Sequence, residues 1–241
     1  MKQVMENYNE EDLKVWNTLF TRQIKNLEDK ACKEYLCYLN ELAPVLHADA
    51  IPNLNELSDL LFEKAGWKIE IVPGLIPVKD FFALLAEKKF CSSTWLRKIS
   101  QLDYLEEPDM FHDIFGHIPL LLDPTFGDFA QKLGEIGLEN HENETIVVQL
   151  QRLYWFSIEF GLIKVNHERR IYGAGILSSF QETNGIFDTN TEIFAFNLEE
   201  IIHSDFNNMT IQTKYYELES FEELFVSLKC YEENLLSNSV Q

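Results

Sequence analysis

Two histidines, His112 and His117, stand five positions apart with Gly116 between them, and a lone carboxylate, Glu159, follows further along the chain. Two imidazoles and one carboxylate that leave the other coordination positions open form the facial triad of non-heme Fe(II) oxygenases. If these residues hold one metal, the fold must bring two separate segments together. It must also distort the histidine segment.

The histidine spacing does not suit a regular helix, on which five residues turn two side chains about 140° apart. The imidazoles of His112 and His117 can therefore converge only if the helix ends or distorts between them, and Gly116 permits such a change. We interpret Gly116 as the break that lets both rings reach one ion. The spacing alone is a weak indication, because a histidine on an apolar face is more often a core residue.

Glu159 strengthens the metal hypothesis because it is the only acid in the apolar run Leu153–Phe160. A carboxylate buried in such surroundings is costly unless it is paired or binds a metal. A buried salt bridge to Arg152 or Lys164 is the alternative that does not involve a metal.

Asp113, directly after His112, allows a competing hypothesis, a hydrolytic zinc site with Asp113 as the general base. Asp in place of Glu in that role and the spacing of the histidines favour it less. An aromatic, partly apolar environment suits oxygen activation better, because it keeps water from the metal.

Composition limits the classes of function. The chain has 241 residues, of which 46% are hydrophobic, and no linker interrupts it, so we expect a single soluble domain over residues 1–241. A formal charge of −20 argues against nucleic-acid and membrane-surface binding. From the sequence we expect neither a signal peptide nor a membrane-spanning stretch, and the four scattered cysteines favour reduced thiols and a cytoplasmic location.

Hydrophobic periodicity and turn residues predict a mostly α-helical fold with a few short β-strands. Asn9 is the expected N-cap of the first helix. The other expected helices cover residues 32–42, 54–65 (stopped at Gly66), 80–88, 124–137 and 143–160. Residues 67–71 alternate and predict a strand, residues 72–77 a loop, and residues 171–175 a strand or turn.

Several blocks in a fixed order resemble the biopterin-dependent aromatic amino acid hydroxylases, in particular the short bacterial phenylalanine 4-monooxygenases. The blocks span roughly Asn9 to Cys230. They are Asp103–Asp109, the motif from His112 to His117, Ile118–Leu121 with Asp123–Pro124, Leu153–Phe156 through Glu159–Leu162, and Tyr172–Ser179.

This resemblance implies the catalytic-domain fold of the family, with Fe(II) held by His112, His117 and Glu159. It also implies a tetrahydropterin site. The residues matched to that site are the backbone of Gly74, Leu75 and Ile76, the ring of Phe81, and Glu107 and Asp113. The polar residue expected two positions after Ile76 is Val78, so we expect one hydrogen bond to the pterin to be lost.

The resemblance also implies which residues bind the amino acid substrate. Arg97 matches the clamp on the substrate carboxylate, oriented by Asp109. The walls of the aromatic pocket match Pro108, Trp155 and Gly175. Ser178 matches the partner of a ligating histidine, Tyr154 and Glu182 match further positions around the metal, and Leu105 and Glu106 lie where the amino-acid end of the substrate is expected.

Together these matches imply a cytoplasmic monooxygenase that converts L-phenylalanine to L-tyrosine with O2, Fe(II) and a tetrahydropterin. Hydroxylation of tryptophan or tyrosine remains open, because members of the family share the ligands. The zinc hydrolase and a catalytically inactive binding protein are the alternatives from other classes. We expect no regulatory domain and no tetramerisation tail. We also expect the protein to be a monomer or a dimer.

Overall fold

The computed structural model describes residues 1–103, 105, 107–188, 191–208 and 210–238, and most of them are helical. The α-helices are α1 (Glu10–Leu27), α2 (Lys33–Glu41), α3 (Leu54–Ala65), α4 (Val78–Ala86), α5 (Pro124–Glu139), α6 (Glu144–Tyr154), α7 (Ala174–Leu177), α8 (Phe180–Gly185), α9 (Leu198–Ile201) and α10 (Phe221–Asn238). Short 3₁₀ segments are η1 (Met5–Asn7), η2 (Ile99–Gln101) and η4 (Pro119–Leu122). Two further segments, η3 (His112–His117) and η5 (Trp155–Glu159), are π-helices.

The strands form two small sheets. β1 (Lys68–Ile71) pairs in parallel with β2 (Lys89–Ser92). The larger sheet has the order β4-β3-β6-β5 and contains β3 (Gly161–Val165), β4 (Glu168–Ile171), β5 (Glu192–Ala195) and β6 (Lys214–Leu218). In it β3 and β4 are antiparallel, whereas β6 runs parallel to both β3 and β5.

Local sequence signals explain where the first helices begin and end. The Asn9 side chain accepts hydrogen bonds from the backbone of Glu11 and Asp12, and the Asp12 carboxylate accepts one from the Asn9 backbone, which is a capping box. α3 starts after Asn53, whose side chain accepts hydrogen bonds from the backbone of Asn55 and Glu56, and ends at Gly66 as predicted. The predicted strand at residues 67–71 is confirmed as β1.

Other elements were predicted only in part. The helix expected over residues 143–160 changes to a π-helix at Trp155, and residues 171–175 divide between the end of β4 and the start of α7. Strands β2, β3, β5 and β6 and the C-terminal helix α10 were not predicted. These strands have only four or five residues, too few for an alternating pattern to stand out.

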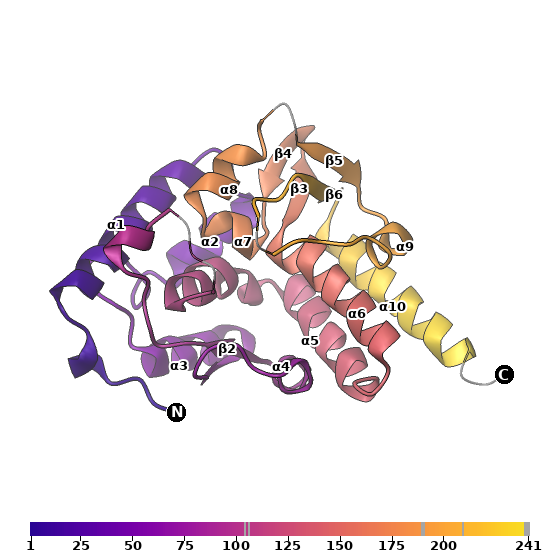
Figure 1. Cartoon of the computed structure of the whole chain (residues 1–241), viewed down its shortest axis with the longest axis horizontal. Helices are drawn as coiled ribbons and strands as arrows, with labels where there is room; N and C mark the ends of the chain where they lie inside the picture. The colour runs from indigo at the N-terminus through magenta and orange to yellow at the C-terminus, as the bar shows by residue number, and fades with distance from the viewer. Residues whose placement is uncertain (104, 106, 189–190, 209, 239–241) are drawn as a thin grey trace.

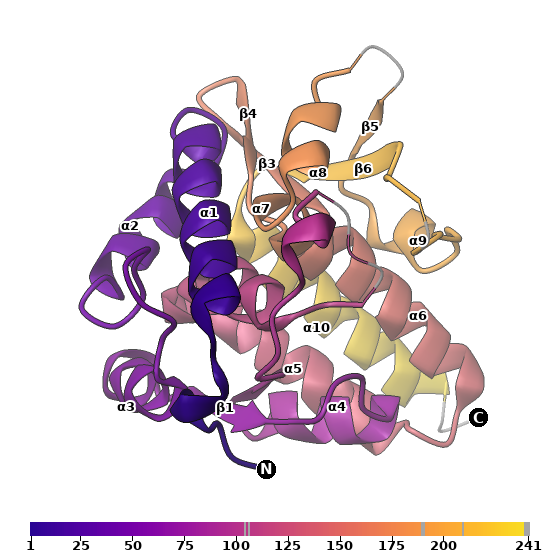
Figure 2. The ribbon, with the colours of Figure 1, turned by 60° about the vertical axis from the view of Figure 1, so that its left-hand side comes forward.

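The elements around the two π-helices meet near the middle of the fold. In Figure 1 the larger sheet and α8 lie above a layer that contains α5, α6 and α10, and α1 to α3 lie on the indigo and violet side. Figure 2 shows α4 below α5, with which it is in contact. The short helix α7 contacts both η3 and η5, while η3 also touches β2 and η5 also touches β3 and β6. The π-helices are therefore enclosed by elements from most of the chain.

A large hydrophobic core surrounds this junction, with Trp16, Phe111 and Phe115 fully buried in it. Phe111 and Phe115 stack with ring centroids 4.8 Å apart, and the edge of Trp16 meets Phe111. Phe111 precedes η3 and Phe115 belongs to it, so these rings anchor the histidine segment. Within the described residues, no helix is both long and apolar enough to cross a membrane.

Replacing Tyr35 by Phe is expected to lower the free energy of unfolding by about 1–3 kcal/mol. Tyr35 is fully buried, and its hydroxyl donates a 2.7 Å hydrogen bond to the backbone carbonyl of Phe115 inside η3, which would lose a partner. Urea denaturation of the variant measures the change. Tyr38→Phe on the same helix is the control, because the Tyr38 hydroxyl reaches Asp123 at only 3.3 Å in a partly exposed position. Equal effects of the two variants would contradict this role for Tyr35.

Candidate metal centre

The π-helical form of η3 explains how two histidines five residues apart can face the same point. In a π-helix the backbone hydrogen bond joins residues i and i+5 instead of i and i+4, and this wider turn brings residues five apart toward one face. The Nε2 atoms of His112 and His117 lie 3.1 Å apart. The predicted distortion of this helix is thus confirmed, and it extends over the whole segment from His112 to His117.

The interpretation of Gly116 as a break is wrong in its mechanism. The π-helix continues through Gly116, which is not among the described glycines with a positive φ. What Gly116 provides is space, because a Cβ there would lie 2.8 Å from the carbonyl oxygen of Ala174 and 3.1 Å from its Cβ. The glycine lets α7 pack directly on the histidine segment.

Glu159 ends the second π-helix and faces both rings. Its Oε1 lies 3.1 Å from His117 Nε2, and its Oε2 lies 3.6 Å from His112 Nε2. The salt bridges considered for Glu159 do not form, since Arg152 pairs with Asp205 and Lys164 with Glu219. The three side chains predicted as metal ligands therefore converge on one point.

The separations among these ligand atoms suit a six-coordinate divalent cation. Neighbouring ligands at right angles, with bonds of about 2.1 Å, lie roughly 3.0 Å apart. The two distances of 3.1 Å match this value, and one ligand atom from each residue lies within 4.8 Å of the others. Two nitrogens and one carboxylate oxygen on one side of the ion leave the remaining positions open.

Electrostatics keep the ligands in the forms that bind metal. Burial lowers the pKa of His112 to about 4, so the ring is neutral at pH 7. Burial raises the pKa of Glu159, but the facing rings of His117 and His112 and a hydrogen bond from the Tyr154 hydroxyl bring it to about 2. A neutral imidazole and an ionised carboxylate need lose no proton to coordinate a cation.

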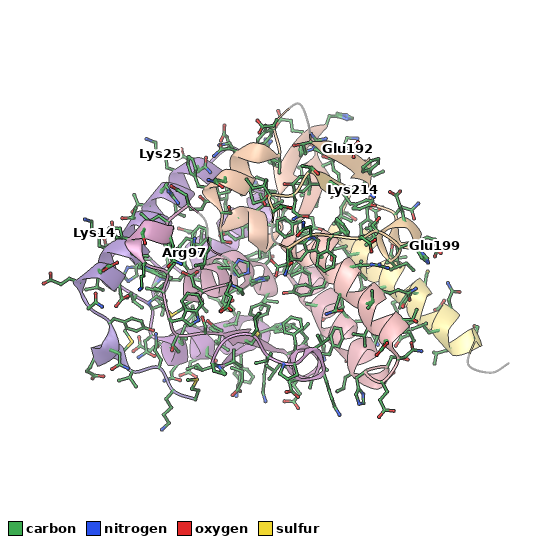
Figure 3. The ribbon with its side chains drawn as sticks, viewed as in Figure 1. Lys14, Lys25, Arg97, Glu192, Glu199 and Lys214 are labelled. Atoms are coloured by element: carbon green, nitrogen blue, oxygen red, sulfur yellow. The ribbon has the colours of Figure 1, made fainter. Side chains whose placement is uncertain are left out.

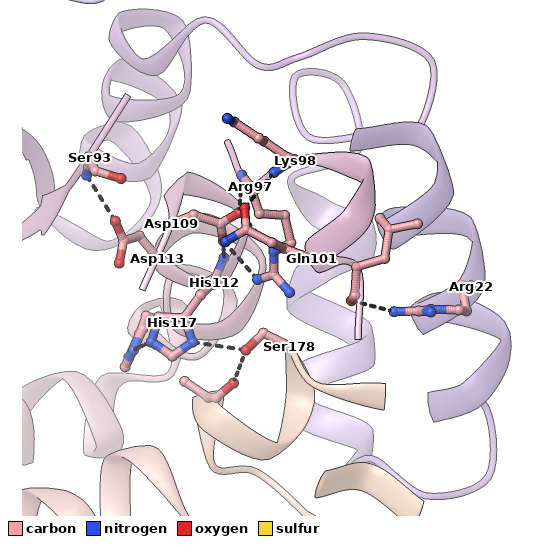
Figure 4. Close-up of polar contacts among 12 residues, drawn as sticks. Arg22, Ser93, Arg97, Lys98, Gln101, Asp109, His112, Asp113, His117 and Ser178 are labelled. Carbon is pink, nitrogen blue, oxygen red and sulfur yellow. Dashed lines mark hydrogen bonds and ion pairs between the residues drawn. The ribbon is translucent and has the colours of Figure 1, made fainter. Parts of the chain in front are cut away.

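Ser178, just after α7, sets the tautomer of His112. Its Oγ donates to the carbonyl of Ala174 at 2.8 Å, so its single hydrogen is used there. The 2.9 Å contact between Ser178 Oγ and His112 Nδ1 must then be donated by the ring. His112 consequently carries its proton on Nδ1, beside Ser178 (Figure 4). The lone pair of its Nε2 then faces His117 and Glu159.

Aromatic rings enclose the His117 side of the centre. The ring of Phe90 on β2 stacks on His117 with centroids 4.5 Å apart, and Tyr154 lies nearly parallel to it at 6.3 Å. Burial and the nearby Glu159 charge hold the pKa of the Tyr154 hydroxyl well above its usual value, so it remains a hydrogen-bond donor to the carboxylate. These rings exclude water from one side of the centre.

A buried ion pair lies beside the histidine segment. Arg97 Nε and Nη2 donate to the two oxygens of Asp109 at 2.9 and 2.8 Å, and the Arg97 backbone adds a third bond. The backbone N–H of His112 also donates to Asp109, at 3.1 Å, so the pair is connected to η3 (Figure 4). Figure 3 shows Lys14 and Lys25 at the outline of the molecule and Arg97 inside it, which agrees with an Arg97 exposure of 7%.

Asp113 turns away from this ion pair. Its Oδ2 accepts a 2.8 Å hydrogen bond from the backbone of Ser93, just after β2. Burial raises the pKa of the Asp113 carboxyl to about 7, although the bond from Ser93 opposes the shift.

A cavity of about 490 Å³ opens in front of the metal ligands, large enough for small organic molecules. All but one of the predicted site residues line it; Asp109 lies behind Arg97, fully buried. The lining residues matched to the pterin are Gly74, Leu75, Ile76, Phe81, Glu107 and Asp113, and those matched to the substrate or the surroundings of the metal are Arg97, Pro108, Tyr154, Trp155, Gly175, Ser178 and Glu182. Leu105 also lines the cavity, whereas Glu106 falls outside the described residues.

Sequence reasoning missed a second part of the cavity wall. Cys91 on β2 contributes to it, and so does the segment between α9 and β6, through Phe206, Asn208, Thr210, Ile211 and Gln212. The wall segment is irregular and carries no periodic pattern or motif. Nothing in the order of its residues indicates which cavity it borders.

Comparison with known proteins agrees with this geometry. The model of the biopterin-dependent aromatic amino acid hydroxylases matches residues 2–240. The chain belongs to this family. The phenylalanine-4-hydroxylase of Chromobacterium violaceum is 42% identical over 226 residues, which cover 93% of this chain and 75% of that protein. The enzyme of the same name from Pseudomonas aeruginosa is 42% identical over 221 residues, covering 91% and 82%.

The fold of the family is also present. A crystal structure of the C. violaceum phenylalanine hydroxylase with iron(III) and the oxidised cofactor 7,8-dihydrobiopterin superposes with a TM-score of 0.92 at 40% identity. The match covers 99% of this chain and 86% of that one. The expected catalytic-domain fold is therefore confirmed.

Glu159→Ala is expected to weaken Co(II) binding by at least about a hundredfold, because it removes the anionic ligand and leaves two imidazoles. Calorimetric titration with Co(II), whose visible spectrum also reports coordination, measures the loss. The control is Glu142→Ala, at a surface acid with 92% side-chain exposure. Unchanged Co(II) affinity in Glu159→Ala would show that the ion binds elsewhere.

Gly116→Ala is expected to lower both the stability, by about 1–3 kcal/mol, and the affinity for Co(II), because the added Cβ pushes α7 and Ser178 away from His112. Gly185→Ala is the matched control, because a Cβ there meets its first atom at 3.9 Å and Gly185 does not line the cavity. Thermal unfolding with and without Co(II) measures both quantities. Loss of stability with intact metal affinity would refute the proposed link from Gly116 to Ser178.

Proposed function

We propose that this protein is a phenylalanine 4-monooxygenase that hydroxylates L-phenylalanine to L-tyrosine with O2, bound iron and a tetrahydropterin. The observation that carries the proposal is a facial set of two histidines and a glutamate at the base of a cavity that also contains a buried, bidentate arginine. Membership of the hydroxylase family supports the metal and the pterin. The relatives named phenylalanine-4-hydroxylase support the substrate.

The metal would be held by His112, His117 and Glu159. When bound, iron and reduced pterin supply the electrons that activate O2, which no side chain of this protein can provide. The protein's own part is to hold three ligands on one side of the ion and to leave the cavity side open. Phe90 and Tyr154 keep water from the ligand side, and Ser178 keeps the lone pair of His112 directed at the ion.

The pterin would lie against the loop of Gly74, Leu75 and Ile76 and the ring of Phe81. The edges of Phe81, Phe90 and Tyr154 meet, with centroids 6.5 and 5.2 Å from that of Phe81, so Phe81 is fixed where it borders the cavity. Val78 also borders the cavity, where an apolar side chain offers the cofactor no hydrogen bond.

The carboxylate of the amino acid would bind to Arg97. A guanidinium has five N–H donors, and the described bonds to Asp109 use two of them, so donors remain for a second carboxylate. Burial alone would raise the pKa of Asp109, but the hydrogen bonds and positive charge of Arg97 and the bond from the His112 backbone hold that pKa below its usual value, which keeps the carboxylate ionised. A fixed, planar guanidinium orients the amino acid so that its aromatic side chain can enter the pocket bordered by Pro108, Trp155 and Gly175.

The other candidate functions receive less support. Tryptophan and tyrosine hydroxylases of this family would share the ligands, but the relatives at 42% identity are named for phenylalanine. A zinc hydrolase does not explain the family match, and an inactive scaffold does not explain why Arg97 and Asp109 are held buried beside the centre. Free thiols at all four cysteines are compatible with the proposed cytoplasmic location. The monomeric or dimeric state stays a prediction.

An aerobic assay with Fe(II) and tetrahydrobiopterin tests the function. Phenylalanine, tyrosine and tryptophan are offered in turn, and products are identified by mass spectrometry. We expect tyrosine from phenylalanine, with one pterin oxidised for each tyrosine formed. Activity that needs zinc and ignores pterin would overturn the proposal. Preferred turnover of another ring would retain the family chemistry and replace the substrate.

Arg97→Lys is expected to raise KM for phenylalanine about ten- to a hundredfold, because an ammonium keeps the charge and loses the bidentate geometry. Co(II) affinity should change little, since Arg97 does not touch the ligand atoms. The control Arg170→Lys alters a cation that pairs with Glu168 in β4. Steady-state kinetics measure KM for phenylalanine in both variants. An unchanged KM in Arg97→Lys would show that Arg97 does not bind the substrate.

A further inference from the structure

The indole of Trp155 is held at its polar edge as well as on its faces. Its Nε1–H donates to Gln212 Oε1 at 3.2 Å. The ring stacks on Phe206, with centroids 4.4 Å apart and an interplanar angle of 15°, and also contacts Phe160 at 4.6 Å. Trp155, Phe206 and Gln212 all line the cavity beside the metal ligands. The rotation of this ring therefore shapes the cavity.

The amide of Gln212 can present only its oxygen to Trp155. Its Nε2 donates to the backbone carbonyls of Asn207 and Thr210, at 2.6 and 2.9 Å. A flipped amide would set its oxygen against those two carbonyls and its NH2 against the indole N–H, so three favourable contacts would become repulsive. Gln212 is thus an acceptor of fixed orientation.

The backbone of Gln212 is fixed as well. Its N–H donates to Glu182 Oε1 at 3.1 Å, and Glu182 Oε2 accepts a 2.8 Å bond from the hydroxyl of Tyr215 on β6. Glu182 and Gln212 are each 8% exposed, and Tyr215 is fully buried. A chain of hydrogen bonds, fully buried between Glu182 and Gln212 and partly buried at the indole, therefore runs from α8 through Gln212 to Trp155. It ends on Glu182, a residue expected near the metal, both of whose oxygens are used to hold this segment.

We propose that Gln212 is a positioning residue that fixes the rotation of the Trp155 indole and thereby sets the preference of the cavity for one-ring over two-ring aromatic amino acids. The inference rests on the proposed function and extends it to a residue that does not touch the reacting atoms. A two-ring side chain needs more width beside Trp155 than a phenyl ring. If the indole can rotate, the cavity can widen enough for a two-ring side chain, whereas a fixed indole keeps the cavity narrow.

The test combines Gln212→Leu, which keeps the size of the side chain and removes all three polar contacts, with Trp155→Phe, which removes the N–H donor. Gln212→Leu should lower the ratio of kcat/KM for phenylalanine over tryptophan about two- to tenfold, the value of one hydrogen bond. In the Trp155→Phe background the same replacement should leave the ratio unchanged. An equal shift in both backgrounds, or no shift in either, would overturn the inference.

Gln131→Leu is the matched control, since Gln131 on α5 also donates to a backbone carbonyl, that of Ala86, but does not line the cavity. Thermal unfolding should show a similar loss of stability in Gln131→Leu, yet its ratio of kcat/KM for phenylalanine over tryptophan should equal that of the wild type. A shifted ratio in Gln131→Leu would assign the effect of Gln212→Leu to general loosening and reject the proposal.

A binding measurement separates this inference from the proposed function. Calorimetry on the Co(II)-loaded protein gives the ratio of dissociation constants for phenylalanine and tryptophan, and Gln212→Leu should shift it in the same direction as the kinetic ratio. If the wild type hydroxylates nothing but the binding ratio shifts, the function fails and the role of Gln212 stands. If the wild type is active and neither ratio shifts, the role of Gln212 fails alone.

Discussion

A carboxylate held beside two imidazoles inside an aromatic core is the constraint on which the rest of this structure depends. At pH 7 the Glu159 carboxylate is ionised and the His112 ring is neutral. Glu159 Oε1 lies 3.1 Å from His117 Nε2, about the separation expected for two ligands of one cation. Such an arrangement is stable only where surrounding groups fix each ligand. Ser178 and Tyr154 do so through hydrogen bonds, and Phe90 does so by stacking.

Both ligand segments adopt the π-helical form, which is rare and needs support from neighbouring structure. In η3 the hydroxyl of Tyr35 satisfies the carbonyl of Phe115, and α7 packs where Gly116 has no side chain. The helix α7 also contacts η5, so one short element holds the two π-helices together. The buried pair of Arg97 and Asp109 extends the same network toward the cavity. Metal ligation and the proposed substrate binding thus share one rigid framework.

Sequence patterns predicted what local chemistry decides and missed what depends on distant contacts. The capped start of α1 at Asn9 and the end of α3 at Gly66 follow from side chains a few residues away. The convergence of the histidines was expected, but it comes from a π-helix that continues through Gly116 and not from a break there, and the glycine leaves room for Ala174. The wall around Gln212 was missed because its contacts reach Trp155 and Glu182, 57 and 30 positions away. Hydrophobic periodicity cannot report such pairs.

By itself the sequence determined the chemistry available to this protein: two imidazoles and a carboxylate as ligands, an excess of acids that disfavours nucleic acid, and blocks of residues typical of one family. These follow from residue identity and order, which need no third dimension. Only the tertiary structure decided that the ligand atoms lie 3.1 to 3.6 Å apart, that Arg97 is buried and bidentate, and that a glutamine accepts the hydrogen bond of the Trp155 indole. Coordination and hydrogen bonding act over a few ångströms, and only packing among distant segments sets distances that short.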